Sequence, residues 1–329
     1  MTPASARVSV RPPADQVSTQ QFAEDVAFYL TQTPRQLPSR YLYDALGSAL
    51  FEAITRLPWY RVTRAETGLL KTHARAILAA CAPLTETVEL GAGSGEKLAR
   101  VLQARDAGSA ELRVHLVDVS RSALSAAAGL LVGLPATQVI THQATYEAGL
   151  AEFRRNQAEA GHTLLLFLGS NMGNFDPPKA NELLRQIRSA LQPGDLFLLG
   201  ADLLKPEREL MLAYDDPLGV TAAFNRNLLV RINRELGADF DLDSFQHRAL
   251  WNATESRMES YLVSTRTQRI RIAEARLELT MRDGETIWTE SSYKYSLDGL
   301  FGSLEAAGFA RRQAWVDEDA QFALTLVQR

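Results

Sequence analysis

One stretch decides the fold: Thr87-Val88-Glu89-Leu90-Gly91-Ala92-Gly93-Ser94-Gly95-Glu96-Lys97, an apolar β-type run that leads into a glycine-rich turn and then a helix. Glycines in the turn permit positive φ and close ligand approach, and the helix start offers unpaired N–H groups. The next expected strand ends in Asp118, whose carboxylate can accept both ribose hydroxyls of a nucleotide. Glu96 stands where the dinucleotide pattern GxGxxG has its third glycine. The stretch therefore favours S-adenosylmethionine over NAD, with a purely structural tight turn as the alternative.

Composition places the chain among globular proteins that act on small molecules. Its 329 residues exceed the usual length of one domain, so a second lobe is expected. Hydrophobic residues make up 46% and charged residues 22%, and the formal net charge is −4. Such a balance provides no basic footprint, so we expect no nucleic-acid partner and no membrane partner.

Cysteine and histidine usage point away from redox and metal chemistry. The single Cys81 lies in an apolar helical run and is expected to be a buried structural thiol in a cytoplasmic protein. None of the five histidines has metal-ligand spacing, so no metal site is expected. Residues 1–20 lack the apolar run of a signal peptide and are expected to form a flexible tail. A monomer is expected.

Strand and helix patterns alternate through the middle of the chain. This rhythm predicts an α/β fold: a mostly parallel, Rossmann-like sheet with helices on both faces. Strands are expected at 87–90, 112–117, 138–141, 163–168 and 195–201, and helices at 95–104, 121–131 and 178–191. A helix near 296–307 and strands near 311–317 and 322–327 close the sheet.

The rhythm changes after Asp202, which predicts an inserted α+β lobe. Helices at 205–213 and 219–236 precede strands of alternating polarity, and Asp283-Gly284 predicts a hairpin turn. Thr63-Arg64-Ala65-Glu66 has the pattern of a capping box. The expected domains are a cofactor domain of residues 66–203 and 294–329, an inserted substrate lobe of 204–293, and helices of 21–65 that join this lobe.

Polar and flexible residues gather where parallel strands end. Ligands of open parallel sheets bind beyond these carboxyl ends, which hold the Gly91 turn, Asp118 and Gly169–Phe175. The Asn174 amide can both donate and accept, so it could hold an amine or a carboxylate. A turn closed by the asparagine side chains is the structural alternative.

Several blocks spread over the chain are more specific than the glycine turn. They are Tyr43–Ser48, Ile54–Tyr60, Thr63–Glu66, Phe167–Ser170 with Gly173-Asn174, Ala213–Pro217, Phe224–Asn227, Phe245–His247, Trp251-Asn252 and Thr289–Ser292. In these blocks the chain resembles the histidine Nα-methyltransferases that begin ergothioneine biosynthesis. The resemblance covers nearly the whole chain from about residue 22, and it implies a Rossmann-like sheet of the class I methyltransferase type with an inserted α+β substrate-binding lobe.

The resemblance implies two sets of site residues. S-Adenosylmethionine is expected at Gly91, Gly93, Lys97 and Asp118, with Thr145 and Tyr146 near the adenine where the family usually has Asp-Phe. Tyr43, Asn174 and Tyr214 match positions that hold the amino and carboxylate groups of the amino acid. Tyr60, Glu290 and Ser292 match positions around the imidazole, with Glu290 accepting a ring N–H. Ser260 replaces the usual methionine of the side-chain pocket, which becomes roomier or more polar.

The resemblance implies Nα-trimethylation of L-histidine to hercynine, with S-adenosylhomocysteine as the second product. Tyr43 and Asn174 are the expected catalytic residues, because they could orient the lone pair of the amine while water takes its proton. One alternative is methylation of another amino acid, such as tryptophan or tyrosine, in a pocket enlarged at Ser260. A non-catalytic module that binds S-adenosylmethionine is the other.

Overall fold

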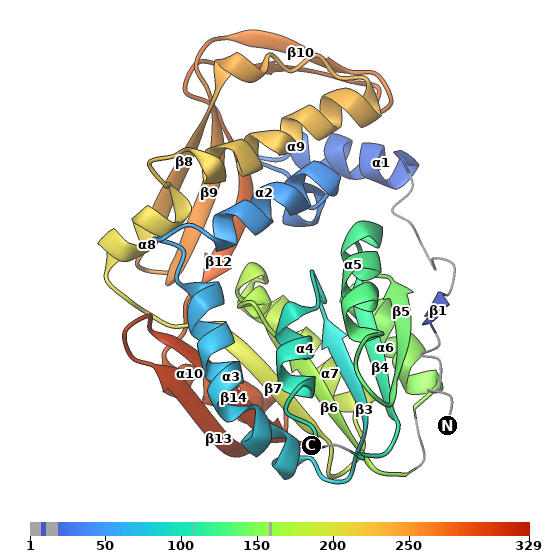
Figure 1. The fold of residues 1–329 in the computed structure, drawn as a ribbon. Coiled ribbons are helices and arrows are strands. Elements are labelled where there is room, and N and C mark those ends of the chain that lie inside the picture. The colour runs from blue at the N-terminus through green and yellow to red at the C-terminus, as the bar shows by residue number, and fades with distance from the viewer. Residues whose placement is uncertain (1–7, 11–18, 107, 158–159) are drawn as a thin grey trace. The chain divides into compact units, whose positions relative to one another are not determined.

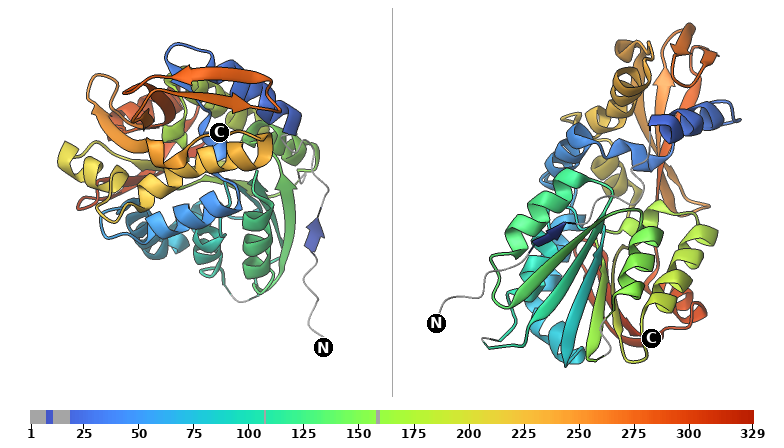
Figure 2. Two further views of the ribbon diagram at one scale, coloured as in Figure 1. Left: turned by 90° about the horizontal axis from the view of Figure 1, so that it is seen from above. Right: turned by 90° about the vertical axis from the view of Figure 1, so that its right-hand side faces the viewer.

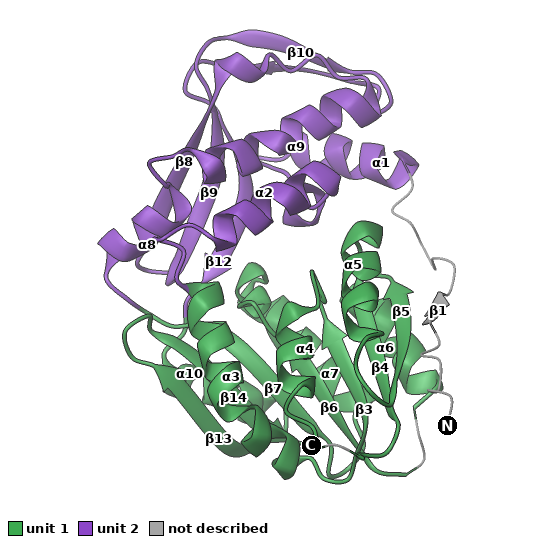
Figure 3. Ribbon diagram, viewed as in Figure 1, with its two compact units in different colours: residues 1–16, 62–204, 295–329 green, residues 17–61, 205–294 purple. Residues whose placement is uncertain are grey.

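The computed structural model describes residues 8–10, 19–106, 108–157 and 160–329. The chain divides into two compact units (Figures 1 and 3). The first contains Met1–Gln16, Val62–Leu204 and Tyr295–Arg329, and the second contains Val17–Arg61 and Lys205–Lys294. The sequence-based boundaries were placed at 65/66, 203/204 and 293/294. Each unit is described by itself below.

An eight-stranded sheet forms the centre of the first unit. Its order is β1 (Val8–Val10), β5 (Thr137–Gln143), β4 (Leu112–Asp118), β3 (Leu84–Leu90), β6 (His162–Phe167), β7 (Leu196–Asp202), β14 (Phe322–Gln328) and β13 (Ala310–Asp317). The strands from β1 to β7 are parallel to their neighbours, and β14 and β13 are antiparallel. The predicted Rossmann-like α/β sheet is therefore confirmed.

Most of the expected N-terminal tail lies outside the described residues. Within it, β1 pairs in parallel with β5, and the first residues of α1 (Thr19–Leu30) are helical. Two short segments of the predicted tail, Val8–Val10 and the start of α1, thus have regular backbone structure. A short strand is hard to predict, because its pairing partner lies more than a hundred residues away.

Helices cover both faces of the central sheet (Figure 2, right). One face carries α3 (Val62–Ala80), α4 (Glu96–Leu102) and α5 (Arg121–Leu131), and the other carries α6 (Tyr146–Arg155), α7 (Pro177–Ala190) and α10 (Leu297–Ala306). Two prolines open α7 at its first turn, where a missing N–H has no effect on the helix. Helix α6 was not predicted from the sequence. It connects β5 to β6, which run parallel in the same sheet and therefore need a crossover connection of this kind.

The strand order reverses beside β3, because β4 lies on one side of it and β6 on the other. Ligands of open sheets bind at the carboxyl ends of the strands at such a switch point. These ends lead into the Gly91 turn, to Asp118 and into the turn that begins at Gly169. The fold thus brings the predicted cofactor segments to one edge of the first unit.

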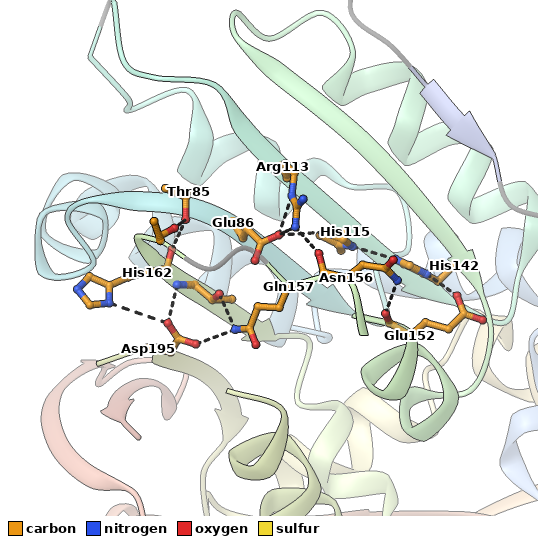
Figure 4. A network of polar contacts seen from close by, with 12 residues as sticks. Thr85, Glu86, Arg113, His115, His142, Glu152, Asn156, Gln157, His162 and Asp195 are labelled. Atoms are coloured by element: carbon orange, nitrogen blue, oxygen red, sulfur yellow. Dashed lines mark hydrogen bonds and ion pairs between the residues drawn. The ribbon is translucent and has the colours of Figure 1, made fainter. Parts of the chain in front are cut away.

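A polar network under α6 fastens this helix to the sheet (Figure 4). His115 Nδ1 lies 3.0 Å from His142 Nε2, and His142 Nδ1 lies 2.8 Å from Glu152 Oε2 of α6. The Glu86 carboxylate pairs with the Arg113 guanidinium at the other end of this network. Both imidazoles are almost fully buried, and these two contacts involve three of their four ring nitrogens. The fourth, His115 Nε2, lies 3.5 Å from Glu86 Oε1 and has no hydrogen-bond partner among the described residues.

The second unit is built on a four-stranded sheet with the order β2 (Arg35–Gln36), β12 (Thr286–Tyr293), β9 (Arg257–Ser264) and β8 (Phe245–Asn252). Helices α8 (Glu207–Tyr214) and α9 (Val220–Leu236) contact β8 and β9, and α9 also packs on α2 (Ala45–Thr55). Short 3-10 helices are η1 (Ser39–Leu42) and η3 (Leu242–Ser244), with η2 (Asn171–Asn174) in the first unit.

The hairpin predicted at Asp283-Gly284 is wrong. The hairpin lies earlier, where β10 (Gln268–Ile272) pairs with β11 (Leu277–Met281) as a separate two-stranded sheet. Gly284 does adopt the positive φ of a turn, +75°, but the strands that it joins belong to different sheets. A local turn signal therefore located the turn without identifying its strand partners.

The Cys81 thiol is buried, as predicted, and burial raises its pKa to about 12. Within the described part of the chain, no helix has the length and apolar character needed to cross a membrane.

Candidate active site

The turn after β3 needs glycine at Gly91. Its φ is +72°, and a Cβ built there would lie 2.8 Å from Asn171 Nδ2 and 3.1 Å from the Tyr146 hydroxyl. The backbone N–H of Gly91 donates to Val117 O at 2.8 Å, which ties the turn to the end of β4. The turn is therefore rigidly placed, and its surface is lined by an amide and a phenol from two other strand ends.

Asp118 fastens the same turn from the end of β4. One carboxylate oxygen accepts from the backbone N–H of Gly93 at 3.0 Å, and the other accepts from that of Ser120 at 2.8 Å. Burial nevertheless raises the pKa of Asp118, because these two bonds only partly replace lost hydration. The structure thus brings Asp118 to the glycine turn, as the sequence predicted.

Glu89 is a site candidate that the sequence analysis missed. It occupies β3 just before the turn, its side chain is 2% exposed, and Oε2 has no hydrogen-bond partner among the described residues. Burial raises the pKa of Glu89 to about 8, against the opposing effect of Lys97. An acidic residue inside an apolar strand run was the available signal, because such a group is rarely buried without a function.

Lys97 is held by Glu66, which corrects the predicted capping box. Both Glu66 oxygens accept from the backbone N–H of Gly169, at 2.8 and 2.9 Å, and Oε2 lies 2.6 Å from Lys97 Nζ. Helix α3 already begins at Val62, so Glu66 is an interior helical residue and is fully buried. The carboxylate joins α3, α4 and the turn after β6 at the predicted cofactor edge.

Gly200 of β7 leaves the space that the Glu66 carboxylate fills. A Cβ built at Gly200 would lie 2.0 Å from Glu66 Oε1. We expect Gly200→Ala to lower the free energy of unfolding by about 2 kcal/mol, as overpacking does in tight interiors. Denaturant titration measures this change.

Gly302→Ala is the matched control, because nothing lies within 4 Å of a Cβ built on that helical residue. It should stabilise the protein slightly, since alanine favours helix over glycine by about 1 kcal/mol. Equal unfolding midpoints for the two variants would contradict the packing argument.

Thr145 and Tyr146 stand at the start of α6, after β5. The Thr145 hydroxyl caps the helix by accepting from Ala148 N at 3.4 Å, and its side chain is exposed. The Tyr146 ring packs edge-on against Phe167 with centroids 5.1 Å apart, and burial raises its pKa. Tyr146 thus joins the wall of the Gly91 turn, whereas Thr145 is used for helix capping.

The turn after β6 carries Asn174 at the end of η2. Ser170 adopts a φ of +58°, and its hydroxyl accepts from Asp202 N at 2.9 Å. The turn is thereby closed through Ser170 and through Gly169. Among the described residues, no hydrogen bond ties the Asn174 amide to this turn, so turn closure does not explain an asparagine at this position.

In the second unit, Tyr43 and Tyr60 belong to an aromatic cluster. The Tyr43 ring meets Phe51 and Phe224 edge-on, each with centroids 5.6 Å apart, and Phe51 meets Tyr60 at 6.3 Å. Tyr60 is 8% exposed and Tyr43 is half-buried. The cluster holds both rings in place. Because Phe224 belongs to α9, this helix helps to set the position of the rings.

Two buried asparagines of α9 support this arrangement. Asn227 donates to the Asp44 carboxylate at 2.8 Å, and Asp44 caps α2 by accepting from Gly47 N at 2.7 Å. Asn225 donates to Tyr261 O at 3.0 Å and lies 2.9 Å from His247 Nδ1. The Phe224–Asn227 block thus fastens α9 to the loop before α2 and to the sheet.

A β-bulge determines which residues of β12 share a face with Ser260. Across the strand pair, Trp288 faces Tyr261 and Glu290 faces Ser260, so Thr289 is the extra residue on β12. Because directly opposed residues lie on one face of a sheet, Ser260, Glu290 and Ser292 form one row. Three predicted substrate residues are therefore brought together.

Glu290 is poorly solvated on this face. Burial raises its pKa to about 7, and the nearby Lys294 ammonium opposes this rise. A carboxyl with such a pKa exchanges its proton near neutrality and can accept a hydrogen bond strongly when ionised.

Tyr214, Ser292 and Lys294 form a closed triangle. Tyr214 O–H donates to Ser292 Oγ at 2.8 Å, and Lys294 Nζ donates to both oxygens at 2.8 Å. Lys294 is 3% exposed, and the sequence analysis missed it. Its position two residues after Ser292, in an alternating strand, was the available signal.

His247 holds the backbone of Tyr214, since its Nε2 lies 2.8 Å from Tyr214 O. Burial lowers the pKa of His247, which favours the neutral ring. Among the described residues, no cluster of His, Cys, Asp and Glu is arranged to hold a metal ion.

Comparison with known proteins agrees with these features. The family model "Histidine-specific methyltransferase, SAM-dependent" matches residues 22–329. Histidine N-alpha-methyltransferase of Mycolicibacterium smegmatis is 40% identical over 306 residues, which cover 93% of this chain and 94% of that protein. The protein of the same name from Mycobacterium tuberculosis is 41% identical over 307 residues, with the same coverage. Ergothioneine biosynthesis protein 1 of Neurospora crassa is 26% identical over 284 residues, which cover 82% of this chain and 32% of that longer protein. This chain belongs to the family of S-adenosylmethionine-dependent, histidine-specific methyltransferases.

Proposed function

We propose that this protein transfers methyl groups from S-adenosylmethionine to the α-amine of L-histidine, three times in succession, and so forms hercynine in ergothioneine biosynthesis. The observation that carries the assignment is Glu290, a poorly solvated carboxyl in one row with Ser292 and Ser260. A carboxylate in such surroundings suits the N–H of an imidazole and suits few other amino-acid side chains.

The first unit fits S-adenosylmethionine. Asp118 stands at the end of β4 where a ribose is held in doubly wound folds, and the Gly91 turn permits close backbone approach. The unpartnered, buried Glu89 oxygen is an acceptor awaiting a donor, such as the amino group of a methionine moiety. When bound, the cofactor supplies a methyl group on a positively charged sulfur. We propose that Gly91, Gly93, Lys97, Asp118, Thr145 and Tyr146 line its site.

The protein's part in the reaction is to align the amine. Displacement at a methyl carbon requires nitrogen, carbon and sulfur in one line, and positioning can supply most of the rate. We assign the amine to Tyr43 and Asn174, with Tyr214 as a further contact of the amino-acid head group. The nucleophile is the neutral amine, so its proton passes to water, because no histidine or carboxylate is assigned as a base.

Repeated methylation needs a head-group site that accepts growing positive charge. Tyrosine rings provide this, since the face of an aromatic ring attracts cations without adding net charge. Tyr43, which is assigned to the amine, is held in the aromatic cluster by Phe51 and Phe224. We therefore propose that the product leaves as the quaternary betaine.

We also propose a cytoplasmic monomer that acts on the free amino acid. A single buried cysteine suits a reducing compartment, and a net charge of −4 provides no attraction for nucleic acid. Size-exclusion chromatography with light scattering tests the monomer.

Mass spectrometry of the purified protein with S-adenosylmethionine and a mixture of free amino acids tests the proposal. We expect mono-, di- and trimethylated histidine in a time-ordered series, and no product when S-adenosylhomocysteine replaces the cofactor. A series on tryptophan or tyrosine would reassign the pocket at Ser260. Bound cofactor without any product would favour a non-catalytic binding module.

A further inference from the structure

Lys294 is an unusual residue to find inside a sheet-and-helix unit. Its side chain is 3% exposed, and its ammonium lies 4.7 Å from the centre of the Tyr214 ring. Removing an ammonium from water is costly, so a buried lysine needs strong partners. A neutral residue could fill the same space without this cost, which indicates that the donors of the ammonium matter.

The triangle around Lys294 fixes the direction of its hydrogen bonds. A serine hydroxyl has two acceptor lone pairs and one hydrogen. Ser292 Oγ accepts from Tyr214 O–H and from Lys294 Nζ, both at 2.8 Å. Both acceptor lone pairs of Ser292 Oγ are thus occupied. Toward a ligand, the Ser292 hydroxyl can therefore only donate a hydrogen bond.

Glu290 has the opposite polarity on the same face. An ionised carboxylate only accepts hydrogen bonds, and Glu290 stands two residues before Ser292 in the same row. A neutral imidazole carries one N–H donor and one bare nitrogen that accepts. Glu290 and Ser292 therefore match the two ring nitrogens one to one, provided that Ser292 cannot turn its lone pair toward the ligand.

We propose that Lys294 is a positioning residue that determines specificity: by donating to both Tyr214 and Ser292, it keeps the Ser292 hydroxyl a donor toward the bare nitrogen of a neutral imidazole. This inference rests on the proposed function and deepens it. Lys294 also opposes the rise in the pKa of Glu290, which favours the ionised acceptor on the other ring nitrogen.

A double-mutant cycle of Lys294→Met and Ser292→Ala tests the proposal in the full-length enzyme. We expect Lys294→Met alone to raise KM for histidine about 10- to 100-fold with kcat changed less than about 3-fold, as for the loss of one or two hydrogen bonds to substrate. In the Ser292→Ala background, Lys294→Met should have a much smaller effect, the remainder being what Lys294 contributes by favouring the ionised form of Glu290. Lys294→Arg keeps charge and donors and should restore part of the affinity.

Lys71→Met is the matched control, because Lys71 is exposed on α3 and is assigned no role. It should leave KM and kcat unchanged. The Kd for S-adenosylmethionine should be the same in all variants, and this measurement also confirms that Lys294→Met is folded. If Lys294→Met does not fold, Lys294→Gln replaces it in the same cycle.

Additive effects of the two substitutions, or an unchanged KM in Lys294→Met, would overturn this role of Lys294 while leaving histidine methylation intact. A wild-type enzyme that methylates a different amino acid would instead overturn the proposed function, and the imidazole role of Lys294 with it. The two failures are therefore distinguished by the wild-type product.

Discussion

Replacing Glu290 by glutamine is expected to lower kcat/KM for histidine about 100-fold while leaving the Kd for S-adenosylmethionine unchanged. A hydrogen bond to a charged acceptor contributes about 1.5–3 kcal/mol, and an amide in its place can also present the wrong group to the ring N–H. Steady-state kinetics with histidine, and calorimetry with the cofactor, measure the two quantities. An equal loss of cofactor affinity would contradict the role assigned to Glu290.

The pH dependence of Glu290→Gln separates the effect of the carboxylate charge from the effect of the side chain's shape. Because the pKa of Glu290 is about 7, its carboxyl is protonated below that pH and loses its acceptor strength. We expect kcat/KM of the wild type to fall as the pH drops through 7, beyond the fall caused by protonation of the amine. Glu290→Gln should show only the contributions of the substrate's own groups, its amine and its imidazole.

The same substitution should stabilise the free protein. A carboxyl whose pKa rises from 4.5 to about 7 on folding contributes stability that is fully present below pH 4.5 and is lost as the pH rises through 7. At pH 8 we expect Glu290→Gln to raise the free energy of unfolding by about 1 kcal/mol, a figure reduced for partial solvent screening. The exposed Glu278→Gln is the control and should change little.

The second large effect is expected at Asp118. Asp118→Ala should raise the Kd for S-adenosylmethionine about 100-fold or more, because it removes the proposed ribose acceptor and also frees the N–H groups of Gly93 and Ser120. Equilibrium dialysis or calorimetry measures this Kd. The relative rates with histidine and tryptophan should not change, since Asp118 has no assigned role toward the amino acid.

Three further variants sharpen this test. Asp118→Asn keeps one acceptor and should fall between the wild type and Asp118→Ala, whereas Asp319→Ala removes an exposed carboxylate and should have no effect. Thr145→Ala should weaken the start of α6 by about 1 kcal/mol, because its hydroxyl caps the helix, and should change the Kd less than Asp118→Ala does. A wild-type Kd in Asp118→Ala would contradict the cofactor assignment.

The central sheet could be predicted from short stretches of sequence, because the residues that indicate each of its strands follow one another in the chain. Buried parallel strands are continuous apolar runs, and the glycine turn and Asp118 follow two of them directly. Glu66 was misread for the opposite reason. Its spacing from Thr63 fits a capping box, but its partners Lys97 and Gly169 lie 31 and 103 residues further along the chain.

The buried polar residues of the second unit were the least predictable. Lys294 follows a strand whose alternation assigns it to the same row as Ser292, yet a lysine is usually read as a solvated end. The hydroxyl of Tyr214, which comes from α8, is one of the partners that the buried ammonium finds. Such contacts depend on how helices pack on a sheet. The spacing of residues in the sequence does not indicate which helix packs where.

The extra residue in β12, Thr289, determines which side chains of this strand share a face with Ser260. If the pairing continued past Trp288 without the bulge, Thr289 would face Ser260 and Ser291 would face Met258, in the places that Glu290 and Ser292 now occupy, although no side chain had been exchanged. A slip of one residue in the pairing at this point would therefore replace the whole chemical character of the row in one step. Relatives with other preferences can thus diverge through the register of this strand as well as through its composition.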